Sequence, residues 1–139
     1  MNWRQVLHYN IMNAKATTGI GNTIDIRDYR NITVRIGTAS SANATIKCVW
    51  AIAGAGQITE ITAPVFSSSQ SVTNNWSYIQ MIDLNDWTAL TGSTGVVATW
   101  TDIYKLYAVN VDNLDYINFN ITAISAGTIT IDIQLTCNT

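Results

Sequence analysis

The side chains that could carry out catalysis are few in this chain. Its single histidine is His8, close to the N-terminus. A Ser-His-Asp or Cys-His arrangement needs a histidine that can accept a proton near neutral pH, and the residues around His8 carry no local signature of such a site. We therefore expect a structural or surface role for His8, a protein that is not an enzyme, and no catalytic residues.

Metal and cofactor sites are equally poorly supported. Structural or catalytic zinc needs three or four His, Cys or carboxylate ligands at suitable spacing, whereas His8, Cys48 and Cys137 are far apart in the sequence. Both cysteines fall on the apolar parity of expected strands, which favours two buried thiols over a disulfide. The glycines of 54–56 lack the lysine and the following helix of a phosphate-binding loop. No metal and no cofactor are expected.

Paired carboxylates occur twice, as Asp83 with Asp86 and as Asp112 with Asp115. Oxygen ligands in a loop suit Ca²⁺ in principle, but neither pair has the length or the glycine of an EF-hand loop, so turn chemistry is the expectation. A glycosidase would need one carboxyl group held protonated against an apolar wall, and nothing singles out Glu60 or any aspartate for that role.

Five tryptophans in 139 residues are the one compositional hint of a ligand. Flat aromatic rings on a sandwich can stack on sugars, so Trp76, Trp87 and Trp100 could form a glycan platform. The alternative is that Trp50 and the others fill the core or an intersubunit contact, where Trp is also common.

The elements that must position these residues are strands. From Gly127 to Cys137 the chain alternates apolar and polar side chains, with Asp132 in the polar row, which is the pattern of a half-buried strand. Further strands are expected over 3–13, 23–27, 28–36, 44–53, 76–84, 95–100, 103–111 and 115–125. Eight or nine strands without a convincing helix predict an all-β fold, an antiparallel two-sheet sandwich of the jelly-roll kind.

The predicted organisation is an N-terminal strand or arm over 1–22 and a β-sandwich domain over 23–139. Two hairpins with similar sequences are expected, at 28–53 and at 115–137, with small residues at their turns. A long surface connection is expected over 54–75, which contains the only proline, Pro64. Loops of this length are usually functional or mobile.

Composition and charge exclude several partners. Charged residues make up only 12% of the chain, about half the usual ~25%, and low surface charge favours self-association. A net charge of −2 argues against nucleic acid as a partner. Residues 1–50 are net basic and residues 51–139 net acidic, so two copies could meet through opposite charges unless the fold mixes the halves. No signal-peptide core or membrane-spanning apolar run is evident, which predicts no membrane and no export.

Several stretches together resemble the small virion proteins of tailed bacteriophages. The resemblance covers about residues 23–137 and rests on Asp28–Asn31, Pro64–Ser67, Gln70–Ser71, Asn75–Leu84, Tyr104–Asn110, Leu114–Asn118, Thr122–Ala123 and Ala126–Ile131. It implies a non-enzymatic part of the particle, a decoration or auxiliary protein on the head, made in the host cytoplasm. Proteins of that kind commonly form trimers and clamp subunits of the major capsid protein.

Candidate interface residues follow from this resemblance and from the strand parities. We expect outward-facing Arg30, Arg35 and Lys47 to meet acidic neighbours, and Trp3 and Tyr9 to act from the N-terminal arm. Asp132 is the acidic member of the outward row of the last strand. A carbohydrate-binding sandwich, such as a receptor-binding fibre domain, is the alternative function, and both a head and a tail position remain open.

Overall fold

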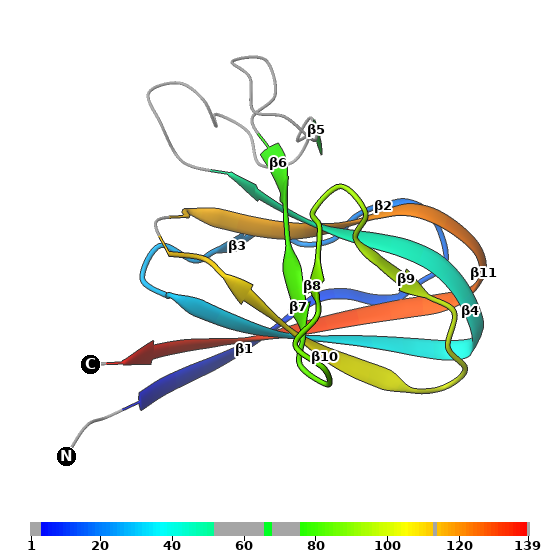
Figure 1. Cartoon of the computed structure of the whole chain (residues 1–139), viewed down its shortest axis with the longest axis horizontal. Helices are drawn as coiled ribbons and strands as arrows, with labels where there is room; N and C mark the ends of the chain where they lie inside the picture. The colour runs from blue at the N-terminus through cyan, green and yellow to red at the C-terminus, as the bar shows by residue number, and fades with distance from the viewer. Residues whose placement is uncertain (1–3, 52–65, 68–75, 113, 139) are drawn as a thin grey trace.

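The computed structural model describes residues 4–51, 66–67, 76–112 and 114–138. The predicted all-β, sandwich-like fold is confirmed (Figure 1). Within these residues all strand pairings are antiparallel except that of β5 with β6. The strands are β1 (Arg4–Lys15), β2 (Gly19–Ile20), β3 (Ile24–Asp25), β4 (Asn31–Ala51), β5 (Phe66–Ser67), β6 (Trp76–Ile79), β7 (Met81–Asp83), β8 (Ala89–Leu90), β9 (Val96–Ala98), β10 (Tyr104–Asn110) and β11 (Tyr116–Asn138).

Two long strands organise this fold. Hairpins were expected at 28–53 and 115–137, but the structure has one continuous strand in each place, β4 with 21 residues and β11 with 23. The two strands pair with each other along almost their whole length, from Tyr116 opposite Ala51 to Thr136 opposite Asn31. The hairpin prediction is therefore wrong. The two segments with similar sequences are the two partners of one antiparallel ladder.

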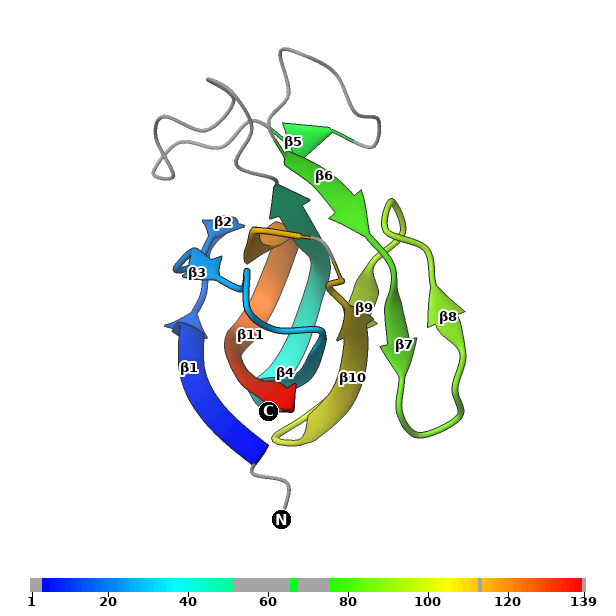
Figure 2. The same cartoon turned by 90° about the vertical axis from the view of Figure 1, so that its left-hand side faces the viewer.

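The paired strands bend in the middle and pass through both layers of the sandwich (Figures 1 and 2). We call the two layers A and B. Layer A contains residues 31–38 of β4 and 129–136 of β11, with β1 on one side and β10, β7 and β8 on the other. Layer B contains residues 43–51 of β4 and 116–126 of β11, flanked by β2 and β3 and by β6 and β9.

Small residues make the bend possible. Gly127 has φ +73°, a left-handed conformation that favours glycine. A Cβ atom at this position would lie 2.7 Å from the Cα atom of Ala42 on the opposite strand. The ladder shifts register on either side of Ala126, as expected for bulges that bend a sheet. The residues that were predicted as hairpin turns are thus the corner where both strands cross from one layer to the other.

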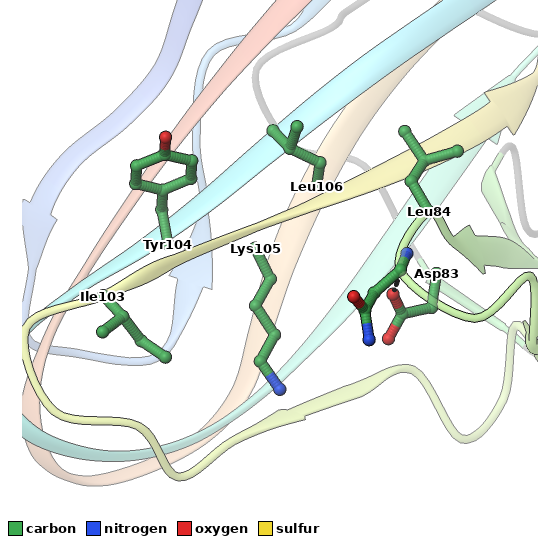
Figure 3. A pocket seen from close by; sticks show the side chains of 7 residues that line it. Asp83, Leu84, Ile103, Tyr104, Lys105 and Leu106 are labelled. Atoms are coloured by element: carbon green, nitrogen blue, oxygen red, sulfur yellow. Dashed lines mark hydrogen bonds between the residues drawn. The ribbon is translucent and has the colours of Figure 1, made fainter.

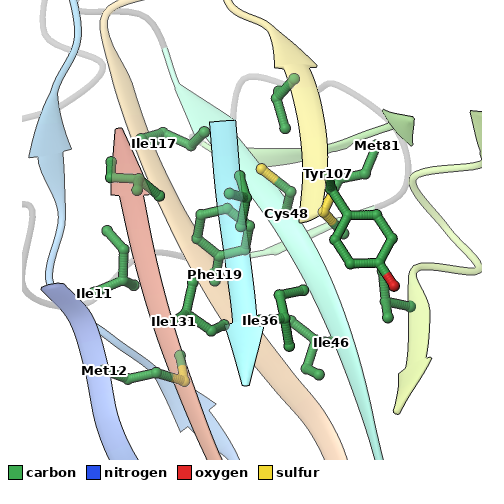
Figure 4. Packing of buried hydrophobic residues seen from close by; sticks show 14 of the residues in the cluster. Ile11, Met12, Ile36, Ile46, Cys48, Met81, Tyr107, Ile117, Phe119 and Ile131 are labelled. Atoms are coloured by element: carbon green, nitrogen blue, oxygen red, sulfur yellow. The ribbon is translucent and has the colours of Figure 1, made fainter. Parts of the chain in front are cut away.

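The core lies between the layers and follows the predicted alternation. Layer A contributes fully buried Ile36 and Ile131, and layer B contributes Ile46, Cys48 and Phe119 (Figure 4). Burial of one such side chain contributes roughly 1.5–3 kcal/mol to folding. The Cys48 thiol is free, as expected, and burial raises its pKa. The side chain of Cys137 lies outside those that the structure describes.

Near the end of β4 the burial departs from the expected parity. The alternation that places Cys48 inward would also place Trp50 inward, in the core position considered for it from the sequence. Instead Val49 and Ala51 are completely buried, and they form a separate small cluster with Tyr78 and Tyr116. Trp50 is only half-buried. The C-terminal end of β4 therefore has buried side chains on both of its faces. A prediction based on alternation along the strand assumes only one buried face.

Asn118 attaches the segment after β1 to the outer face of layer B. It is the only buried polar residue in the described part of the chain, with no exposed surface. Its amide nitrogen donates to the carbonyl oxygen of Gly21 at 3.0 Å and to Thr23 Oγ1 at 2.9 Å. Its amide oxygen accepts from the backbone N–H groups of Gly21 at 3.1 Å and of Phe119 at 2.7 Å. A fully buried amide is stable only when it is satisfied in this way.

The N-terminal segment is joined to the same sheet. β1 pairs with β11 from Arg4 opposite Asn138 to Lys15 opposite Ile129, and it forms the edge of layer A. Of the two descriptions offered for this segment, a strand or an arm, residues 4–15 are a strand. The connection predicted over 54–75 lies, except for β5, outside the described residues.

Candidate functional site

A row of polar side chains crosses four neighbouring strands on the outer face of layer A. The registers place Asn10 of β1 opposite Asp132 of β11, and Asp132 opposite Arg35 of β4. Arg35 is in turn opposite Leu106 of β10, two residues from Tyr104. Because alternate residues of a strand share a face, all these side chains point away from the core. We call Asn10, Asp132, Arg35 and Tyr104 the Tyr104 row.

Each side chain of the Tyr104 row contacts the next one across the sheet. Asn10 Nδ2 donates to Asp132 Oδ1 at 2.9 Å, and Arg35 Nη2 donates to Asp132 Oδ2 at 2.9 Å. The Arg35 guanidinium carbon lies 5.7 Å from the centre of the Tyr104 ring, within the range of a cation–π contact. The row ends in this ring, which is 62% exposed.

Opposing effects act on the pKa of Asp132, the acidic member of the row. Partial burial works to raise the pKa of this carboxyl group, but the hydrogen bonds from Asn10 and Arg35 and the charge of Arg35 outweigh it, so that the pKa lies below its usual value. Asp132 is therefore ionised at neutral pH. Together with Arg35 it forms a pair without net charge that still offers both donors and acceptors.

Two hollows flank Tyr104. The smaller, of about 240 Å³, is lined by Arg35, Gly37, Thr38, Asp102, Ile103, Tyr104, Thr130 and Asp132. The larger, of about 490 Å³, is lined by Asp83, Leu84, Asn85, Ile103, Tyr104, Lys105 and Leu106 (Figure 3). Since Ile103 and Tyr104 line both hollows, the start of β10 is a ridge between them.

The larger hollow lies where β7 separates from β10. The backbone N–H of Leu84 donates to the Leu106 carbonyl at 3.1 Å. Beyond this bond the chain turns, with the Asp83 carboxylate accepting from the Asn85 N–H at 2.8 Å. Figure 3 shows Tyr104 and Leu106 on one side of the strand and Ile103 and Lys105 on the other. Both sides of the strand therefore contribute to the hollow, and its lining mixes apolar and polar side chains.

Lys105 lines this hollow, and its ammonium group contacts an aromatic ring. Its Nζ lies 4.5 Å from the centre of the Trp100 ring. Trp100 is partly buried and packs against the core. Trp100, one of the three tryptophans considered for a glycan platform, is thus engaged by its own chain.

Of the other two tryptophans considered for the glycan platform, only Trp87 has a side chain that the structure describes. Trp87 is 73% exposed in the turn between β7 and β8, with φ +62°. The side chain of Trp76 lies outside those that the structure describes. The carboxylates Asp83 and Asp86 of the same turn cap backbone N–H groups, those of Asn85 and Thr88, which is the turn chemistry expected for them.

The structure brings two of the six predicted interface residues together, Arg35 and Asp132. Tyr9 is 40% exposed on β1, and Trp3 lies outside the described residues. Arg30 is exposed and lies 3.7 Å from the carboxylate of Asp112. Lys47 is half-buried on the outer face of layer B, with its Nζ 4.8 Å from the centre of the Tyr78 ring. Their role at an interface stays a prediction.

The charge asymmetry between the two halves of the sequence is reduced by this arrangement. Arg35 and Arg30, both from the basic half, pair with Asp132 and Asp112 from the acidic half. Among the described residues no group of three or more His, Cys, Asp or Glu side chains could hold a metal ion. His8 is exposed on β1, opposite Gln134. No helix in the described part of the chain is long and apolar enough to cross a membrane.

Sequence reasoning missed the central aromatic residue of this surface. Tyr104 was named only as part of an expected strand over 103–111 and of one stretch in the phage resemblance, and Asn10 only as part of an expected strand over 3–13. The available signal was the alternation of that strand, which places Tyr104 and Leu106 on the outer side and buries Tyr107 and Val109. Their proximity to Arg35 and Asp132 depends on pairings over about seventy to one hundred and twenty residues of sequence, which strand patterns do not specify.

Comparison with known proteins gives a likeness in fold. The sequence matches no protein-family model and no curated protein. The SPBc2 prophage-derived protein YomS is similar with a TM-score of 0.68 and 12% identity, over 96% of this chain and 95% of YomS. The PBSX exported protein XepA is similar with a TM-score of 0.67 and 12% identity, over 96% of this chain but only 38% of XepA. This chain therefore shares its fold with a whole prophage-derived protein and with one part of a larger protein.

Proposed function

We propose that this protein is a non-enzymatic structural component of a tailed-phage particle, a decoration protein that binds the major capsid protein on the outside of the head. The observation that carries the proposal is the fold shared with prophage-derived YomS over nearly the whole of both chains. The resemblance of residues 23–137 to small virion proteins supports it independently. The protein would be made in the host cytoplasm and reside in the virion, with neither nucleic acid nor a membrane as its partner.

The proposed mechanism is multivalent binding. A homotrimer that contacts three equivalent places on a shell gains avidity far beyond that of one weak patch. The chain has little charge with which to keep copies apart. Arg30 and Lys47 are proposed as charged shell contacts. Tyr9 and its neighbours on the exposed edge strand β1 are proposed as further contacts, since an edge strand can add to a strand of another subunit.

Cosedimentation tests this proposal. Purified protein is mixed with heads and, separately, with tails of the phage that encodes it, and we expect it to sediment with heads only. Sedimentation equilibrium should give three times the chain mass of 15.2 kDa. Binding to tails alone, or to neither, would contradict the head assignment, and a monomer would contradict the trimer.

Charge variants test the contact residues. The double variant Arg30→Asp with Lys47→Asp should lower head binding by about tenfold or more, because it places like charges against an acidic partner. Arg30→Lys with Lys47→Arg is the matched control, since it keeps both charges and should bind as the parent does. Equal binding by the two double variants would rule out these residues as contacts.

A further inference from the structure

We propose that the Tyr104 row and the smaller hollow beside it form a binding site for a neutral carbohydrate. The tryptophan platform considered from the sequence lies elsewhere. This site is defined by three properties of layer A. They are an exposed aromatic ring, an ion pair without net charge that can form further hydrogen bonds, and a rigid framework of paired strands. It does not depend on the proposed role in a phage particle.

Tyr104 supplies the surface on which a sugar ring can pack. The C–H groups of a pyranose form an apolar face that packs on aromatic rings. Tyr104 lies on β10, which is paired with β4 from Gly37 onward, so its backbone is fixed. Arg35 approaches the ring to 5.7 Å, but with 62% of the residue exposed most of the ring remains accessible. The exposed side chain of Leu106, which lies on the same side of β10 as Tyr104, extends this apolar surface.

Arg35 and Asp132 supply the hydrogen bonds. A guanidinium has five N–H donors, and Asp132 takes up the Nη2 group of Arg35 at 2.9 Å. A carboxylate can accept about four hydrogen bonds, of which Asn10 and Arg35 supply one each. Both groups therefore keep capacity directed to solvent. Neighbouring hydroxyl groups of a sugar act as donor and acceptor at once and match such a pair.

The charges favour a neutral ligand over an ionic one. Arg35 is neutralised by Asp132, and the hollow is also lined by Asp102. An anion such as a phosphate would meet two carboxylates. A cation would meet Arg35 at the ring on which it would have to stack. A polyhydroxyl ligand without charge avoids both costs.

The framework reduces the cost of binding. The four side chains come from four adjacent strands whose order is β1, β11, β4 and β10. Asp132 is held on both sides by hydrogen bonds, and the hollow's Asp102 accepts from the Ser40 N–H at 2.7 Å. Because these groups are already ordered, little conformational entropy is lost when a ligand binds.

Binding to an oligosaccharide array tests the inference with the full chain. The probes are neutral glucan, mannan, galactan and N-acetylhexosamine oligomers, with a heparin oligosaccharide and polyphosphate as anionic probes. We expect binding to at least one neutral probe. Tyr104→Ala should weaken it by about tenfold or more, and Tyr104→Phe should retain most of it because the ring stays in place. Trp87→Ala is the matched control and should bind as the parent does, since it removes an exposed aromatic side chain elsewhere.

A second variant tests the argument from charge. Asp132→Asn leaves Arg35 without its counter-charge, so affinity for neutral probes should fall while affinity for the anionic probes rises. Absence of binding to every neutral probe, or equal binding by Tyr104→Ala and the parent, would overturn the inference. Loss of binding in Trp87→Ala but not in Tyr104→Ala would move the site to the tryptophan turn. A protein that binds sugars but not heads would refute the decoration role alone.

Discussion

Two outward-facing polar residues of the same strand, Asn118 and Asp132, have opposite environments. Both alternate with inward-facing isoleucines of β11. Asn118, in layer B, is completely buried because the backbone at Gly21 covers it and forms hydrogen bonds with it. Asp132, in layer A, has only side-chain partners, Asn10 and Arg35, and remains partly exposed.

The partners of each polar side chain on β11 distinguish a role in folding from a role in ligand binding. Where a buried polar side chain bonds to the backbone of another segment, its donors and acceptors stabilise the fold and are not available to a ligand. Where it is held only by other side chains at the surface, the net gain in stability is small and capacity for a ligand remains. Asn118 belongs to the first kind and Asp132 to the second.

The largest expected effect is at Asn118. Asn118→Ala should lower the free energy of unfolding by roughly 2–4 kcal/mol, because it removes four hydrogen bonds at a fully buried position and leaves the C=O of Gly21 without this donor, while the Gly21 N–H keeps only the Phe119 carbonyl. Denaturant titration measures this loss. Asn120→Ala is the control, since it removes the same amide from the same face of β11 at a half-buried position. Similar losses in the two variants would contradict the role given to Asn118.

The corner between these two ends of β11 gives the next effect. Gly127→Ala should lower the free energy of unfolding by about 2 kcal/mol, because φ is +73° and the new Cβ would lie 2.7 Å from Ala42 Cα. Gly37→Ala is the matched control on β4, where the nearest atoms would be 3.8 Å away. Thermal or denaturant unfolding compares them, and a tolerated Gly127→Ala would mean that the strands do not need this sharp corner.

A smaller effect is expected at the exposed end. A double-mutant cycle with Arg35→Ala and Asp132→Ala should give a coupling of about 0.2–1 kcal/mol, the usual range for a surface ion pair. A coupling as large as the loss at Asn118 would show that the Tyr104 row supports the fold, and the distinction between the two residues would fail.

The smallest effect is a dependence on pH. The pKa of Asp132 is lowered in the folded protein, so its contribution to stability is present above the unfolded value of about 3.9 and is lost as pH falls through the folded pKa. The difference in unfolding free energy between the parent and Asp132→Asn should therefore be constant from neutral pH to about pH 5 and shrink in more acidic solution. A difference that grows on acidification would have the wrong sign. No such change is expected for Asn118, since an amide does not titrate.

Alternation in the sequence predicts which face of β11 a residue lies on, but not what covers that face. The alternation of 127–137 identified the inward isoleucines and the outward row containing Asp132, and Arg35 was likewise expected on an outward face. The same alternation cannot tell that Asn118 is covered, because the covering segment lies about one hundred residues earlier in the chain. It also cannot distinguish a hairpin turn from a corner, since glycine and other small residues serve both. The prediction at Gly127 was therefore correct about a change of direction and wrong about the partner strand.

The pairing of β1 with the last residues of β11 has a consequence for how the chain reaches its fold. The strand partners of residues 4–15 lie at 129–138, so β1 cannot complete its pairing until the end of β11 has emerged from the ribosome. β4 waits similarly for β11. Most of the sandwich therefore forms after synthesis of this region, by closing large loops, and its folding should be slow compared with that of proteins built from local contacts.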